Sequence, residues 1–135
     1  MTGDELIAQF ERGTTPAASF HHADHVRLAF EYLCRYPVLE ALGKFSAALR
    51  RFACAQGRAS LYHETITWAY LFLIRERMLP ADHRQTWEEF AADNADLLSW
   101  ERGKGSILTR YYQPDTLASD AARTAFLLPD RTLIG

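Results

Sequence analysis

The sequence has few cysteines and no recognisable export signal. Cys34 and Cys54 are its only two, too few for the disulfide framework that stabilises small secreted domains. Residues 1–5 include two acidic side chains, and no long apolar stretch follows them, unlike the basic and then apolar start of a signal peptide. We therefore expect a cytoplasmic protein whose two thiols are reduced and buried.

The chain also lacks an excess of charge of one sign and a long apolar run. Fifteen basic and seventeen acidic residues give a formal net charge of −2, whereas nucleic-acid-binding domains usually carry a basic patch. The most apolar stretch, residues 68–74, is only seven residues long, and a membrane-spanning helix needs about 20. Nucleic acid and membrane are therefore not the expected partners. A small molecule or another copy of the chain, as a homodimer, fits better.

No segment alternates apolar and polar residues, and no hairpin dipeptide or internal repeat is present, which argues against a β-sheet. Apolar residues instead recur at helical spacing over 4–12, 19–36, 37–56 and 61–78. Ser19 and Ser60 are the expected N-caps of the second and fourth of these helices. Shorter helices are expected from Thr86, and from Asp115 or Thr116 through Phe126. We predict one all-α domain over residues 1–135, a bundle of four main helices with an irregular helical C-terminal third.

Two short histidine motifs open the second and fourth predicted helices. One is Phe20-His21-His22-Ala23-Asp24-His25 and the other is Tyr62-His63-Glu64-Thr65. Short connections make successive helices antiparallel neighbours, so both motifs should lie at the same end of the bundle. His22 and His25 are three residues apart and share a helix face. With His63 they predict a shared site.

Three inward-facing histidines at one end of a bundle are typical of a metal site. Helix N-termini carry partial positive charge and favour neutral imidazole, the form that ligates metal. We therefore predict a metal-dependent enzyme acting on a small molecule. His22, His25 and His63 are its expected ligands, and Glu64 is a further ligand or the general base. This ligand set suits zinc, iron, nickel or copper, and the sequence does not choose among them.

The same residues are compatible with two other functions. In a metal-free pocket, the histidines and Glu64 bind or deprotonate a small ligand, with Arg27 holding an anion. In a helical interaction module, the histidines only cap helices or bond to buried backbone carbonyls. A buried Glu64 needs a partner because an unpaired buried carboxylate is unfavourable, and an ion pair with Arg27 or Arg51 satisfies it as well as a metal does.

The chain resembles a group of small uncharacterised bacterial helical proteins with the patterns F-x-H-x-x-H-[VL]-R-x-A-[FW], Y-H-E-T-I-T and S-x-x-x-x-S-D-x-A-R. The residues that match are Phe20, His22, His25, Val26, Arg27, Ala29, Phe30, Tyr62 to Thr67, Ser119, Asp120, Ala122 and Arg123. The first serine of the third pattern is replaced here by Asp115 or Thr116. The resemblance supplies no reaction. It favours His22 over His21 and marks Arg27, Glu64 and Asp120 as candidate catalytic residues.

Overall fold

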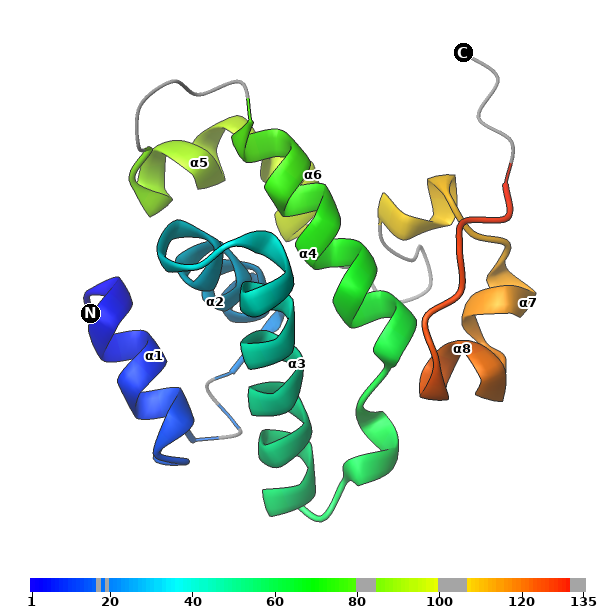
Figure 1. Cartoon of the computed structure of the whole chain (residues 1–135), viewed down its shortest axis with the longest axis horizontal. Coiled ribbons are helices and arrows are strands. Elements are labelled where there is room, and N and C mark those ends of the chain that lie inside the picture. The colour runs from blue at the N-terminus through cyan, green and yellow to red at the C-terminus, as the bar shows by residue number, and fades with distance from the viewer. Residues whose placement is uncertain (17, 19, 80–84, 100–106, 132–135) are drawn as a thin grey trace.

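The computed structural model describes residues 1–16, 18, 20–79, 85–99 and 107–131. All regular structure in these ranges is helical and no strand occurs in them (Figure 1), which confirms the all-α prediction. The main helices are α1 (Gly3–Glu11), α2 (His22–Arg35), α3 (Val38–Ala55) and α4 (Glu64–Met78). The shorter ones are η2 (Ala59–Leu61), α5 (Trp87–Asp93), α6 (Ala95–Leu98), η3 (Ile107–Arg110), α7 (Pro114–Leu117) and α8 (Asp120–Thr124). In the described part of the chain, no helix is both long and apolar enough to cross a bilayer.

The two histidine motifs themselves start α2 and α4. His21 precedes α2 as its N-cap, and its backbone N–H donates to Asp24 Oδ2 at 2.9 Å; the predicted cap Ser19 lies outside the described residues. Ser60 does not cap α4, because residues 59–61 form the turn η2 and extended backbone follows. His63 is the N-cap of α4 instead. Both starts therefore use a histidine where serine was expected.

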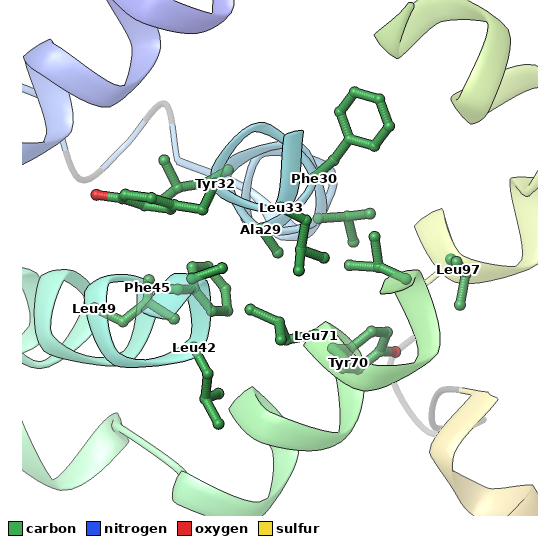
Figure 2. Packing of buried hydrophobic residues seen from close by; sticks show 14 of the residues in the cluster. Ala29, Phe30, Tyr32, Leu33, Leu42, Phe45, Leu49, Tyr70, Leu71 and Leu97 are labelled. Carbon is green, nitrogen blue, oxygen red and sulfur yellow. The ribbon is translucent and has the colours of Figure 1, made fainter. Parts of the chain in front are cut away.

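Helix α2 occupies the centre of the molecule and packs against α1, α3, α4, α5 and α6. Its Leu28, Ala29 and Tyr32 are fully buried, and Figure 2 shows Ala29 and Leu33 facing Phe45 of α3 and Leu71 of α4. Helices α3 and α4 run in opposite directions, as predicted, but α2 is seen nearly end-on between them in Figure 1 and so crosses both. Helix α4, which contains the most apolar stretch of the sequence, residues 68–74, packs against fewer helices than α2 does.

The C-terminal segment, residues 107–131, covers one side of α4 (Figure 1). After η3 it forms two short helices, α7 and α8, rather than the single helix expected through Phe126. Ser119 ends the continuity because its side chain accepts the N–H of Ala122 at 3.1 Å and so caps a new helix, α8. Phe126 then packs against Trp68 of α4, with ring centroids 5.0 Å apart. The irregular C-terminal third is thus a docked layer.

The two cysteines are not both buried. Cys34 is half-buried on α2, whereas Cys54 is exposed near the end of α3. The expectation of a buried Cys54 was wrong because the apolar stripe of α3 passes through Phe45, Leu49 and Phe52, and Cys54 lies on another face.

Candidate functional site

A cleft of about 760 Å³ lies where the first turns of α2 and α4 meet the second half of α3 and the turn η2. Most of its wall is apolar, from Phe20, Leu49, Phe52, Leu61 and Ile66. The polar residues that line it are His25, Gln56, Arg58, Tyr62, His63 and Thr67. The volume and the mixture of apolar wall and few polar groups are those of a small-molecule site. The prediction that both motifs reach one site thus holds for His25 and His63.

A second, smaller cavity of about 50 Å³ lies behind this cleft, between α2, α3 and α4. His22 and Tyr70 line it together with core residues. His25, Leu49, Ile66 and Thr67 line both the cleft and the cavity, so the two spaces meet at these side chains. His25 is the titratable group at their junction.

His25 is a neutral imidazole whose ring nitrogens accept and donate no hydrogen bond to the described residues. Its ring lies against Phe20, with the two centroids 4.3 Å apart. Burial lowers the pKa of His25 to about 4, and the neighbouring His22 adds to the effect while Asp24 opposes it. At neutral pH the ring therefore presents one N–H donor and one lone pair.

The His22 side chain bonds to the backbone of α6. Its Nε2 lies 3.0 Å from the backbone oxygen of Leu97, and because a carbonyl only accepts, Nε2 carries the hydrogen. The ring also meets the Tyr70 ring edge-on, at 4.9 Å between centroids. Burial lowers the pKa of His22, and the bond to Leu97 offsets part of this. His22 thus anchors α6 to the start of α2.

Both ring nitrogens of His63 form hydrogen bonds to the backbone. Nδ1 accepts the backbone N–H of Ile66 at 3.1 Å, which caps α4. Nε2 donates to the backbone oxygen of Leu117 at 2.8 Å, at the end of α7. Together the two bonds select the neutral tautomer that is protonated on Nε2. The sequence offered capping and carbonyl bonding as the structural alternative for these histidines, and His63 does both.

The predicted metal ligands are therefore not arranged around one point. A transition metal needs a ring lone pair, and the lone pair of His63 already faces the Ile66 N–H. Across residues 1–16, 18, 20–79, 85–99 and 107–131, no group of three or more His, Cys, Asp or Glu side chains is placed to hold a metal ion. The three-histidine site stays a prediction, and forming it requires His63 to release at least its bond to the Ile66 N–H.

Glu64 is buried and fully engaged. Its Oε1 accepts from the Tyr62 hydroxyl at 2.5 Å and from Trp68 Nε1 at 2.9 Å, and its Oε2 pairs with the Arg50 guanidinium. The expected ion pair forms, but with Arg50 rather than with Arg27 or Arg51. Burial and the Glu64 carboxylate raise the pKa of Tyr62 to about 12. These bonds direct Glu64 away from the cleft, which it does not line.

Arg27 and Asp120 lie apart from the histidines. Arg27 donates to the backbone oxygen of Met1 at 2.8 Å and pairs with Glu31 at 3.4 Å, so it fastens the N-terminus to α2. The Asp120 side chain is 95% exposed at the start of α8, and its charge partner is Arg123 at 3.5 Å. Neither lines the cleft or the cavity behind it.

Thr65 and Arg58 are the important side chains that sequence reasoning did not single out. The Thr65 hydroxyl donates to the Ala125 oxygen at 2.8 Å and accepts the Leu127 N–H at 3.1 Å, which joins α4 to the chain after α8. Arg58 stands at the cleft. A threonine in a first helical turn and an arginine after Gly57 are both ordinary, so no local signal distinguishes them.

Comparison of the chain with known protein families, with curated proteins and with solved structures gives no significant match. Fold and site alone therefore define the class: an all-α domain with a mostly apolar cleft at the start of two helices.

Proposed function

We propose that this protein binds a small, mainly apolar molecule in the cleft, with neutral His25 as its hydrogen-bonding partner. The observation that carries the proposal is the state of His25. It stands at the junction of the cleft and the inner cavity, has a pKa held near 4, and has no hydrogen-bonding partner among the described residues. The ring is only partly buried and lines the cleft, so a ligand that enters the cleft can bond to it.

The contrast with the other motif histidines supports the same assignment. His22 and His63 are bonded to backbone oxygens of Leu97 and Leu117, so they stabilise the walls of the site. His25 lies on the same side of the molecule and faces an apolar wall that includes Phe20 and Phe52. A ligand with an apolar body and one hydroxyl or N–H group matches that surface. The neutral imidazole accepts this hydrogen and is also in the form that a general base requires.

The test uses 2-naphthol, which combines an apolar body with one hydroxyl donor, in an NMR titration of the intact chain. We expect shifts of backbone amides around the cleft. Ala53→Phe fills the cleft, since Ala53 lines it, and we expect affinity to fall by about tenfold or more. Ala55→Phe on the exposed face of the same helix is the matched control and leaves binding unchanged.

A second pair of probes isolates His25. His25→Leu keeps an apolar side chain but removes the acceptor, so 2-naphthol loses about fivefold in affinity, the value of one net hydrogen bond. Naphthalene, which has no hydroxyl, binds both proteins equally. Titration shifts outside the cleft, or binding that survives Ala53→Phe, contradict the proposal.

A further inference from the structure

Arg58 carries the only Asp, Glu, Lys or Arg side chain among the described residues that line the cleft. It is exposed, and in the described part of the chain its guanidinium forms no ion pair or hydrogen bond. The nearby Arg50, by contrast, is engaged by Glu64 and lies over the Tyr62 ring at 5.0 Å. Among the described residues, the cleft therefore has one cation that is free to bind a ligand and no carboxylate that competes for it.

The backbone fixes Arg58 in place at the rim. Gly57 adopts a positive φ of 68° and ends α3, and the Arg58 N–H then donates to the Ala53 oxygen at 2.9 Å. The Arg58 oxygen in turn accepts the Leu61 N–H at 2.9 Å. These bonds on both sides are the helix-ending arrangement that glycine permits. Arg58 thus belongs to a structured corner of the cleft, although its side chain is exposed.

The helix ends around the cleft give a mixed electrostatic field. Helices α2 and α4 begin there and α3 ends there, so two partial positive charges face one partial negative charge. The partial negative charge at the end of α3 is reduced because its last carbonyls accept the Gly57 and Arg58 N–H groups. The first turns of α2 and α4 also carry the Asp24 and Glu64 carboxylates, so the preference for an anion rests on the Arg58 guanidinium.

The rest of the wall suits an apolar body. Phe20 and Phe52 lie 5.1 Å apart between ring centroids, and Leu61, beside Arg58 in the turn, is 67% exposed. An exposed leucine at the rim of an apolar cleft gains burial when a ligand covers it. One planar guanidinium matches one carboxylate through two parallel hydrogen bonds.

We infer that the ligand of this cleft is an amphipathic organic acid, with its carboxylate on Arg58 and its apolar body against Phe20, Phe52 and Leu61. This inference rests on the proposed function, since it specifies the ligand of the same cleft. A cationic ligand is disfavoured by Arg58, and a polyphosphate needs more positive groups than this one side chain supplies.

The test compares 2-naphthoate with its neutral isostere 2-naphthamide, titrated by NMR into the intact chain. We expect the carboxylate to bind about tenfold more tightly than the amide, because a charge-assisted hydrogen bond is roughly twice as strong as a neutral one. Arg58→Gln removes this preference and leaves amide binding within about twofold. Arg58→Lys, which keeps the charge but loses the planar fork, retains part of the preference.

Arg51→Gln is the matched control. It removes the same charge from an exposed position on α3 that does not line the cleft, and we expect both ligands to bind as before. Equal affinity for carboxylate and amide in the unmodified protein, with both lost in Ala53→Phe, overturns the inference about Arg58 and leaves the proposed function standing. A preference for 2-naphthoate over 2-naphthamide that survives Arg58→Gln also overturns the inference about Arg58 and leaves the proposed function standing. Failure of both ligands and of 2-naphthol to bind overturns the proposed function itself.

Discussion

Two histidines near the same cleft have opposite roles, and their comparison separates architecture from recognition. Both nitrogens of His63 are bonded, to the Ile66 N–H and to the Leu117 oxygen. The ring of His25 lies against the apolar Phe20 ring and has no hydrogen bond to the described residues. The residue type is the same and the position in a first helical turn is similar. What differs is whether a backbone group from another segment comes within reach.

The first turn of α4 likewise has side chains that are bonded to other segments and side chains that face the cleft. Glu64 pairs with Arg50 of α3, and Thr65 bonds to the backbone of the C-terminal segment. The side that faces the cleft carries Ile66 and Thr67 beside the unbonded His25. Substitution of Glu64 or Thr65 should therefore lower stability, whereas substitution of residues that line the cleft should weaken ligand binding.

The largest stability loss is expected for Glu64→Ala. It leaves the Tyr62 hydroxyl, the Trp68 N–H and the Arg50 guanidinium without their shared acceptor. Orphaned buried donors are expensive, and we expect about 3 kcal/mol lower free energy of unfolding in urea. Glu76→Ala removes an exposed carboxylate from the same helix and should change it by less than about 0.5 kcal/mol. Similar losses in both variants contradict the role given to Glu64.

The second prediction concerns pH. His25 takes up a proton near pH 6.5 in the unfolded chain but only near pH 4 in the folded one. Its contribution to stability is therefore complete above pH 6.5 and is lost as the pH falls from 6.5 to 4. Between these limits we expect the unmodified protein to lose about 2 kcal/mol more than His25→Gln.

The measurement is urea unfolding of both proteins across that pH range. His22, whose pKa burial also lowers, and Asp24 are present in both proteins, so the difference reports the titration of His25 together with its coupling to these two neighbours. Parallel stability curves would show that folding does not lower the pKa of His25.

Thr65→Val is expected to have a smaller effect. The isosteric valine removes the bonds to the Ala125 oxygen and the Leu127 N–H, and we expect a loss of about 1.5 kcal/mol. Hydrogen exchange should accelerate at the Leu127 amide before it does in α2, because the C-terminal segment is released locally. Thr124→Val, at an exposed hydroxyl that bonds only within its own helix, is the control. Unchanged protection at Leu127 counts against the link between α4 and this segment.

The smallest effect is expected for zinc. Because the His63 lone pair already accepts the Ile66 N–H, saturating zinc should shift the melting temperature by less than about 1 °C, whereas a site occupied at 100 times its Kd adds about 2.7 kcal/mol. His63→Ala tests the origin of any shift. Stabilisation by zinc in the unmodified protein that disappears in this variant would establish the predicted metal site and end the distinction between His25 and His63.

The fold class and the main helices were predictable because their signals are local. Apolar spacing defined α2, α3 and α4 to within a few residues. The N-caps were less predictable: Ser60 has the better intrinsic preference, yet His63 caps α4 because its Nδ1 reaches the Ile66 N–H while Nε2 is held by Leu117. The homodimer and the cytoplasmic location stay predictions.

The candidate site stays a prediction, and only part of its predicted membership comes together. Helix order brought His25 and His63 to one cleft, yet Arg27 and Asp120 belong to other surfaces. Glu64 pairs with Arg50 instead of the neighbouring Arg51 because a helix turns by about 100° at each residue, so only Arg50 is directed at α4. Arg58 had no sequence signal because its position depends on how α3 ends.

By itself, the sequence determined an all-α chain, its principal helices and the meeting of two histidine motifs at one cleft, since periodicity and short connections act over neighbouring residues. Only the tertiary structure decided which histidine is available. That choice depends on backbone oxygens 75 residues from His22 and 54 residues from His63 along the chain, which no local pattern encodes. His25 remains open to a ligand because no distant segment of the described chain supplies it with a partner.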